Sequence, residues 1–466
     1  MKKIFTLLSV LALAFSANAG EFVSPGNGTV YTLEDLSKID STGVHAQDGV
    51  WFLDTIFTIS EGDVIRIQNN EVLKFGNKVQ INIYGALECQ PADTALVTTQ
   101  ADVTPKGFRL LGENSSAKVA NTRFEYVGFN VSTANGKFEA QNCTFAVYNG
   151  SLSSGANINF SQSSKGHVIQ NCNFLEGAAA AIGNGANTPV GITITNCYFY
   201  ANNYKNSNRP QINLTVAGDG DVVISDNTLI GGHYTKVGGI AVSNMLGLAF
   251  SNTVTVSNNI VKENRYGITM TGPVNLRIID NTIVDNIYET NAMNGGSAIS
   301  LYDTNGNGTV YVKGNYMENN LWGITIIGKP NVNVGKVEDP NAADYNPGEN
   351  IFKNNGNGGQ LYDLYNNGTS TVYAQGNVWN VAVQDSASIE QVVTHFADNP
   401  NLGLVIFMPA GEVEPSSIND VAEAAPVESI RYFNILGRES EKPFEGVNIV
   451  VTRFTNGKVS TSKQLW

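Results

Sequence analysis

Three of the four cysteines in this 466-residue chain share one local sequence. Cys143, Cys172 and Cys197 each follow an asparagine and stand two residues before a phenylalanine, in QNCTF, QNCNF and TNCYF. Thiolates are nucleophiles and metal ligands, so a recurring cysteine raises the question of a metal or redox site. The spacings are 29 and 25 residues, and no histidine or acidic residue recurs beside the cysteines, which argues against a metal site. The other interpretation is a column of small buried side chains, a place that free cysteine fills well.

The cysteines belong to a repeat that runs through most of the chain. Its pattern is an apolar residue, any residue, Asn, Asp or Gly, then Cys or Asn, any residue, and a second apolar residue. Self-similarity at about 20–50 residues indicates a stacked repeat architecture. Runs such as TVTVSN alternate apolar and polar residues as strands do. The third pattern position, here called the marker, is held by Asn121, Asn142, Asn171, Asn196, Asp226, Asn258, Asp280, Gly314, Glu349 and Gly376. Their uneven spacing excludes a strict helical solenoid, in which every unit has nearly the same length.

The repeat resembles that of secreted pectate-lyase-like proteins, whose chains wind into a right-handed parallel β-helix with loops of any length at its turns. We therefore expect an all-β fold, a single-stranded solenoid of the right-handed parallel β-helix type. It would carry an N-terminal cap and a small C-terminal β domain. This fold hosts enzymes, adhesins and plain scaffolds, so it leaves the function open.

The resemblance implies a ladder of asparagines, stacked coil upon coil at one turn inside the solenoid. In this chain the ladder would comprise Asn227, Asn259, Asn281, Asn315, Asn350 and Asn377. Asparagine suits the place because it tolerates the left-handed turn conformation and can bond the next amide, about 4.8 Å along the stack. Cys143, Cys172 and Cys197 hold the same position in earlier coils, so a cysteine column would precede the ladder. Neighbouring strands are close enough for one disulfide, which stays an open alternative.

Eight residues after the marker, five successive coils carry an aromatic side chain. We take this aromatic column, with Arg209, as the candidate carbohydrate-binding residues; its members are Tyr204, Tyr234, Tyr266, Tyr288 and Trp322. Exposed rings would rise about 4.8 Å per coil, near the length of one sugar unit, and rings stack on the C–H faces of sugars. The asparagines two places before most of these rings would contact sugar hydroxyls. The alternative is that the rings pack on a turn of the solenoid wall.

Catalytic residues are harder to assign than binding residues. An inverting glycoside hydrolase needs two carboxyl groups about 6.5–9.5 Å apart, and the chain has no Asp-Asp pair. A polysaccharide lyase needs a basic residue to take a proton, with Ca²⁺ or an arginine to neutralise a uronate. The candidates are Lys236, Arg265 and His233. If the chain is an enzyme, these residues favour a lyase over a hydrolase. No metal site or cofactor is expected, except Ca²⁺ for a lyase.

The N-terminus has the pattern of a secretory signal peptide. Lys2 and Lys3 precede an apolar run, and Ala17-Asn18-Ala19 fits a cleavage site, so we expect cleavage after Ala19. The protein would then be secreted, extracellular or on the outer cell surface, with the periplasm as an alternative. No later run approaches the ~20 apolar residues of a transmembrane helix. Without its signal the chain has 26 basic and 41 acidic residues, a net charge of −15, which argues against nucleic acid as a partner. With no oligomerisation signal, we expect a monomer.

Five parts are expected along the chain. They are the signal peptide (1–19), an N-terminal cap with irregular first coils (20–85), the parallel β-helix with its closing segment (86–410), a linker (411–429) and a C-terminal β domain (430–466). Thr32 and Asp35 predict a capped helix near the start. The last part resembles the C-terminal sorting domain of Bacteroidetes type IX secretion substrates. That resemblance rests on YFNILGR (432–438), Gly446 before VNIVV, and NGKVSTSK (456–463), while Asn448 departs from the usual tyrosine.

Three functions follow from these observations. The first is a secreted or surface β-helix that binds polysaccharide along the aromatic column without cleaving it. The second is a polysaccharide lyase or glycoside hydrolase whose site has no recognisable motif. The third is a structural or adhesive surface protein. Exposed rings would favour the first two hypotheses over the third.

Overall fold

The computed structural model describes residues 21–150, 155–412, 427–434, 438–444, 447–454 and 459–465. The chain divides at Gly411 into two units, a long one before this residue and a short one after it. The predicted signal peptide lies outside the described residues, as does most of the predicted linker. Within the described part of the chain, no helix is long and apolar enough to cross a membrane.

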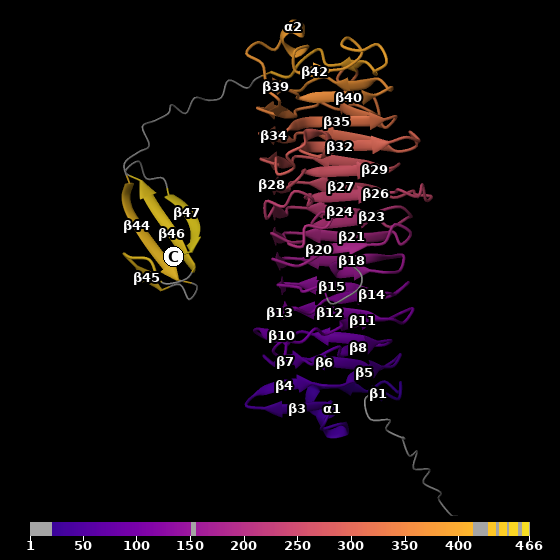
Figure 1. Ribbon diagram of the computed structural model, residues 1–466, viewed down its shortest axis with the longest axis vertical. Helices are drawn as coiled ribbons and strands as arrows, with labels where there is room; N and C mark the ends of the chain where they lie inside the picture. The colour runs from indigo at the N-terminus through magenta and orange to yellow at the C-terminus, as the bar shows by residue number, and fades with distance from the viewer. Residues whose placement is uncertain are drawn as a thin grey trace, which may run out of the picture. The chain divides into compact units, whose positions relative to one another are not determined.

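The first unit is a parallel β-helix in which each coil passes through three sheets in turn (Figure 1). Neighbouring strands in a sheet come from successive coils and pair in parallel, except that β3 and β4 at the N-terminal end are antiparallel. Sheet 1 consists of β1 (Glu21–Val23), β5 (Ile56–Ile59), β8 (Gln80–Ile83), β11 (Gly107–Leu110), β14 (Phe129–Val131), β17 (Ala156–Phe160), β20 (Ala180–Asn184), β23 (Ile212–Thr215), β26 (Ile240–Ser243), β29 (Ile268–Thr271), β32 (Ser297–Asp303), β35 (Trp322–Gly328), β40 (Leu364–Gly368) and β42 (Val393–Thr394).

The other two sheets complete each coil. Sheet 2 consists of β2 (Val30–Tyr31), β6 (Val64–Ile67), β9 (Ala86–Cys89), β12 (Ser116–Ala120), β15 (Phe138–Gln141), β18 (Ser164–Gln170), β21 (Val190–Thr195), β24 (Val222–Ser225), β27 (Val254–Ser257), β30 (Leu276–Ile279), β33 (Thr309–Lys313), β36 (Asn331–Gly335), β41 (Val372–Ala374) and β43 (Val405–Ile406). Sheet 3 consists of β3 (Val44–Gln47), β4 (Val50–Leu53), β7 (Val72–Phe75), β10 (Ala95–Thr99), β13 (Thr122–Glu125), β16 (Thr144–Ala146), β19 (Asn173–Leu175), β22 (Tyr198–Tyr200), β25 (Thr228–Ile230), β28 (Ile260–Lys262), β31 (Thr282–Val284), β34 (Tyr316–Glu318) and β37 (Ile351–Lys353).

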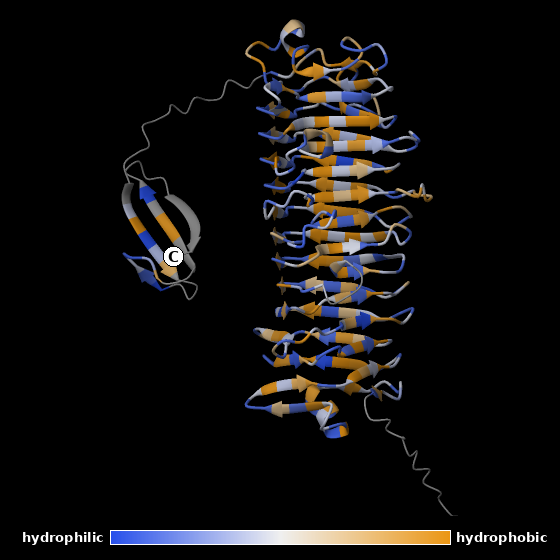
Figure 2. Ribbon diagram, viewed as in Figure 1, coloured by the Kyte–Doolittle hydropathy of each residue, from blue (hydrophilic) through white to orange (hydrophobic). Residues whose placement is uncertain are grey.

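Alternation of apolar and polar residues along the strands builds the core (Figure 2). In β24, Val222 and Ile224 are buried, whereas Val223 and Ser225 between and after them are partly exposed. Because successive side chains of a strand point to opposite faces, each coil adds one apolar row to the interior. Sheet 3 contributes a stack of inward-facing rings whose centroids are 4.8–5.2 Å apart, formed by Phe124, Phe145, Phe174 and Phe199. Each such ring pair adds about 0.5–1.5 kcal/mol beyond its buried area.

The marker residues form the tight turn between sheet 2 and sheet 3. All ten have positive φ, from 48° at Asn121 to 70° at Gly376. Asparagine, aspartate and glycine reach this left-handed conformation at low cost, which explains why they dominate the position. From residue type alone, this conformation is expected of the ladder asparagines. The structure corrects that expectation, because the residue before each ladder asparagine makes the turn and frees the ladder side chain to point inward.

The regular coils begin earlier than the expected boundary at residue 86. Parallel pairing already joins β1 to β5 and β2 to β6. The connection from sheet 2 to sheet 3 is longer here than at the ladder turn: four residues join β6 to β7, whereas two join β24 to β25. Helix α1 (Leu33–Ile39) covers this end. Thr32 is its N-cap, and Thr32 and Asp35 form the expected capping box.

The opposite end of the solenoid is closed by the segment after Trp379. Strands β42 and β43 add the last strands of sheets 1 and 2, and α2 (Ser386–Ile389), capped by Asp385, precedes both strands in the sequence. The hairpin of β38 (Gly356–Asn357) and β39 (Gln360–Leu361) lies between β37 and β40 in the sequence. The second unit is an antiparallel sheet in the order β45 (Glu439–Ser440), β44 (Val427–Asn434), β46 (Val447–Phe454) and β47 (Val459–Leu465). Gly446 and residues 456–458 of the sorting-domain resemblance lie outside the described residues.

Candidate functional site

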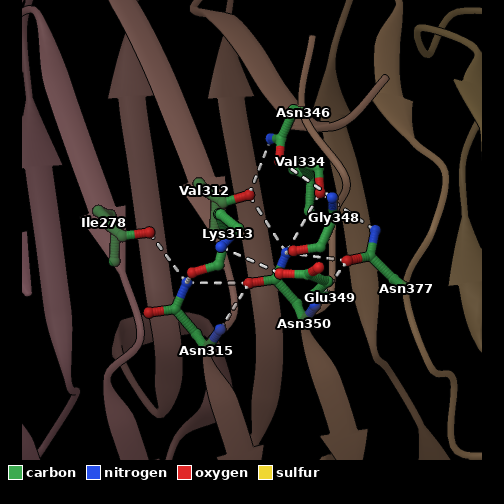
Figure 3. Close-up of polar contacts among 10 residues, drawn as sticks. All are labelled: Ile278, Val312, Lys313, Asn315, Val334, Asn346, Gly348, Glu349, Asn350 and Asn377. Atoms are coloured by element: carbon green, nitrogen blue, oxygen red, sulfur yellow. Dashed lines mark hydrogen bonds and ion pairs between the residues drawn. The ribbon is translucent and has the colours of Figure 1, made fainter. Parts of the chain in front are cut away.

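The predicted asparagine ladder is present and buried. From Asn227 to Asn377, each Nδ2 donates to the Oδ1 of the next asparagine across 2.8–2.9 Å. Figure 3 shows its C-terminal end, where Asn315, Asn350 and Asn377 lie in one line and their amides also bond main-chain oxygens such as that of Val312. Each amide thus satisfies turn groups that water cannot reach. The ladder is structural and presents no atom to a ligand.

The cysteine column leads directly into this ladder. The main-chain N–H of Cys197 donates to Asn227 Oδ1 across 2.9 Å, and the N–H of Cys172 contacts Cys197 Sγ at 3.4 Å. All four cysteines are free and buried. Cys89, which the repeat left out, lies 3.2 Å from the hydroxyl of Thr122, the residue in the ladder position below Cys143. Burial raises the pKa of Cys89 to about 12, so this thiol stays protonated and unreactive.

A second asparagine ladder stands five residues after the first. Asn264, Asn286, Asn320 and Asn355 are buried, and Nδ2–Oδ1 bonds of 2.9–3.0 Å join Asn286 to Asn320 and Asn320 to Asn355. These asparagines precede the aromatic column, and the expectation that they contact sugar hydroxyls is wrong because the turn points them inward. At Gly232 the ladder has no side chain. Gln211 fills that gap, accepting from Asn202 at 3.0 Å and donating to Asn264 at 3.1 Å.

The five rings of the aromatic column do not form one continuous line. Tyr204 is exposed, and the ring of Tyr234 lies against Gly232 in its own loop. Tyr288 stacks on His233, with ring centroids 4.1 Å apart and planes within 6°. Tyr266 lies against Gly238, and Trp322 packs beside Tyr362 and Tyr365 at 4.6 and 5.7 Å. The column therefore divides into two groups. The outer group lies near Tyr204, and the inner group consists of Tyr266 and Trp322.

The inner group lines a pocket on the outer face of sheet 1. Its volume is about 230 Å³, and its aromatic walls are Tyr266, Trp322 and Tyr365, which we call the aromatic pocket. Its floor is a row of outward-facing residues on stacked strands, where Thr269, Ser300 and Thr325 are in register with Tyr365. The residues at 292–295 form another wall. None of the residues that line this pocket has a charged side chain. Burial raises the pKa of Tyr266 to about 12, so its phenol is a hydrogen-bond donor rather than a base.

Arg265 holds the wall of this pocket instead of lining it. Its Nε donates to the main-chain oxygen of Asn294 at 3.0 Å, and its Nη1 donates to Asn208 Oδ1 at 2.5 Å. Glu289 Oε2 lies 3.9 Å from the same guanidinium, and both side chains are less than a fifth exposed. On the pocket side, the indole N–H of Trp322 donates to the oxygen of Ala292 at 2.8 Å, in the turn η1 (Ala292–Asn294). Arg265 and Trp322 thus donate hydrogen bonds to the same loop from two sides.

The other predicted site residues lie apart from the aromatic pocket. His233 Nε2 is 3.1 Å from Glu263 Oε2, and Glu263 also pairs with Lys262 at 2.9 Å. Lys236 and Arg209 are exposed in neighbouring loops, and the guanidinium of Arg209 lies over Gly155. The sequence search missed Tyr365. Only strand register places it beside Trp322, so the repeat pattern had no signal for it.

Ser164 and His167 have the geometry of a nucleophile and its general base. The position of the proton on the histidine ring excludes that role. Their Oγ and Nε2 atoms are 2.8 Å apart. His167 Nδ1 accepts from the N–H of Phe138 at 3.1 Å, so in the neutral ring the proton is on Nε2, which must donate to the serine. Burial lowers the pKa of His167 to about 4, which keeps the ring neutral. The pair is therefore structural, at the point where β18 departs from regular register.

Residues 127–305 match the model of a family described as "Right handed beta helix region". With the three parallel sheets, this match confirms the expected fold class, an all-β right-handed parallel β-helix. No curated protein matches the sequence. Among the described residues, no group of three or more His, Cys, Asp or Glu side chains is placed to hold a metal ion.

One similar solved structure is that of a mannuronic acid specific polysaccharide family 6 lyase enzyme from human gut microbiota. It is 13% identical, with a TM-score of 0.34, and the alignment covers 72% of this chain and 87% of that chain. At this identity and TM-score, the likeness says nothing about the activity of the present chain.

Proposed function

We propose that the protein binds a neutral polysaccharide in the aromatic pocket and does not cleave it. The observation that carries the proposal is the combination of ring walls and a hydroxyl floor in one uncharged hollow. Rings stack on the C–H faces of sugars, and the hydroxyls of Thr269, Ser300 and Thr325 offer donors and acceptors to sugar hydroxyls.

Charge decides which polysaccharide class fits best. A uronate polymer needs cations to neutralise its carboxylates, and no residue lining the aromatic pocket is charged. The nearest guanidinium, that of Arg265, is already bonded to Asn294 and Asn208. The chain as a whole carries a formal charge of −13, which repels a polyanion. These facts favour a neutral glycan, which a secreted protein would meet outside the cell.

Catalysis has less support from the same geometry. The pocket walls present no carboxyl group, imidazole or amine that could act as a general acid or base. His233, Lys236 and Arg265 do not converge on it. Binding without turnover is therefore the simplest function for this site.

Titration calorimetry against two series of soluble oligosaccharides tests the proposal. One series is neutral, from glucan, xylan and mannan, and the other is anionic, from alginate and pectate. We expect binding in the neutral series, reduced about tenfold or more by Trp322→Ala, a change of about 1.4 kcal/mol. Tyr84→Ala is the matched control because Tyr84 is 42% exposed on a distant coil.

Two outcomes would overturn the proposal. The first is that no neutral oligosaccharide binds, which would favour a structural or adhesive role. The second is that shortened products appear in the same samples by mass spectrometry, which would replace binding with an enzymatic function.

A further inference from the structure

Four tyrosines gather on and beside β22, outside the aromatic pocket. Tyr198, Tyr200 and Tyr204 are 37%, 40% and 46% exposed. Tyr234 belongs with them, because its ring and Ala201, the residue after Tyr200, both lie against Gly232. We call these four residues the tyrosine surface. Two of them, Tyr198 and Tyr200, belong to no function assigned above.

The strand itself explains why two rings face solvent. Phe199 lies between Tyr198 and Tyr200 and is fully buried, stacked on Phe174 with centroids 4.8 Å apart. Because alternate residues of a strand point to opposite faces, this inward anchor fixes both tyrosines on the outer face of sheet 3. Within the described residues, no hydrogen bond holds either phenol. Tyr316, farther along the sheet, differs because its hydroxyl bonds Glu318 at 2.7 Å.

The neighbours of the two rings suit a sugar better than an ion. In register with Tyr198 are Asn173 and Thr228, and in register with Tyr200 are Leu175 and Ile230. All are uncharged, and between them the two tyrosines stay 37% and 40% exposed. The nearest lysine, Lys262, is paired with Glu263 at 2.9 Å. None of the residues in register with the two rings is a cation, whereas Asn173 and Thr228 flank Tyr198 with an amide and a hydroxyl.

The tyrosine surface also connects with the aromatic pocket. The loop between β25 and β26 carries Tyr234, and the ring of Tyr266 lies against Gly238 of the same loop. Tyr266 in turn is a wall of the pocket. Tyr266 follows β28, two coils after β22, and Trp322 follows β34, four coils after β22, so the rise along the solenoid is about 10–20 Å. A polymer chain of a few sugars spans that distance.

From this arrangement we propose that the tyrosine surface is a second binding subsite, which holds the part of a neutral polysaccharide chain that extends beyond the aromatic pocket. This inference rests on the proposed function. Its distinguishing consequence is a dependence on ligand length. A short oligosaccharide fills the pocket alone, and a long one also covers Tyr198 and Tyr200.

The test compares two ligand lengths on one double variant, Tyr198→Thr/Tyr200→Thr. Threonine is chosen because it favours strands and already occupies position 228 in the same column. A trisaccharide and a decasaccharide of whichever neutral glycan the wild type binds are titrated by calorimetry. The double variant should lose about tenfold in affinity for the decasaccharide and keep its affinity for the trisaccharide. Trp322→Ala should weaken both ligands, and Tyr84→Ala neither.

The possible failures are distinguishable. Unchanged decasaccharide affinity in the double variant, with trisaccharide binding intact, overturns the second subsite and leaves the aromatic pocket standing. Absence of any neutral-glycan binding by the wild type overturns both proposals. Equal loss for both ligands in the double variant, with an unchanged melting temperature, shows that the two rings belong to the pocket itself and also overturns the second subsite.

Discussion

Arg265 Nε donates to the main-chain oxygen of Asn294 across 3.0 Å, a bond between two loops that are 29 residues apart in sequence. The same guanidinium reaches Asn208 in a third loop. Arg265, a catalytic candidate from the sequence, therefore joins three loops through its hydrogen bonds. Its position behind the pocket wall places the order of these loops under one side chain.

Replacing Arg265 with methionine should loosen this wall. Methionine keeps the apolar stem but removes every donor, and it leaves Glu289 without its partner. We expect a loss of about 1–3 kcal/mol in the free energy of unfolding. Neutral-oligosaccharide affinity should also fall, because Ala292 would no longer hold the indole of Trp322 in place. Denaturant titration and calorimetry measure the two effects. Arg277→Met, at an exposed site over Tyr311, is the control, and equal behaviour of the two variants would contradict this role of Arg265.

Cys197 should accept replacement by asparagine. The new Oδ1 can accept from the N–H of Cys172, and the new Nδ2 can donate to Asn227 as each ladder asparagine does to the next. We expect the free energy of unfolding to stay within about 1 kcal/mol of wild type. Cys197→Val, similar in size but without an acceptor, should lose about 1–3 kcal/mol because it leaves a buried N–H unpaired. A valine variant as stable as the asparagine variant would argue against a ladder role for this position.

Asp363 should make the closed end of the solenoid less stable as pH rises. Its side chain is fully buried, Oδ2 accepts from the N–H of Asn380 at 2.7 Å, and Oδ1 has no partner among the described residues. Burial raises its pKa to about 7 from an ordinary 3.8. The folded state therefore holds the proton more tightly than the unfolded state. The associated stability is complete below pH 4 and is lost as pH rises towards 7.

Asp363→Asn isolates this effect, since an amide still accepts from Asn380 and cannot ionise. We expect similar melting temperatures for the two proteins near pH 4. At pH 8 the variant should be more stable, by up to about 3–4 kcal/mol. Thermal melts of both proteins from pH 4 to pH 8 provide the measurement. A constant difference across that range would show that Asp363 does not titrate there.

The sequence predicted the parts of the molecule that repeat. Asn227 and the asparagines after it recur at one offset from a turn residue, and Cys143, Cys172 and Cys197 occupy the same offset, so pattern alone located both columns. The second ladder was visible at the same stage, at Asn264, Asn286 and Asn320, but its direction was misread. A turn residue in the left-handed conformation reverses the direction in which the next side chain points. The sequence alone did not show which residue takes that conformation.

By itself, the sequence determined the coil, its turns and its buried columns, because these depend on residue types that recur at fixed local spacing. Only the tertiary structure decided which aromatic rings share a surface. Trp322 and Tyr365 lie 43 positions apart in the printed sequence and meet because strand register and loop length bring them together. Loop lengths vary freely between coils, so ring positions that look equivalent in the repeat diverge in space. The aromatic column became a pocket and a separate tyrosine surface for this reason.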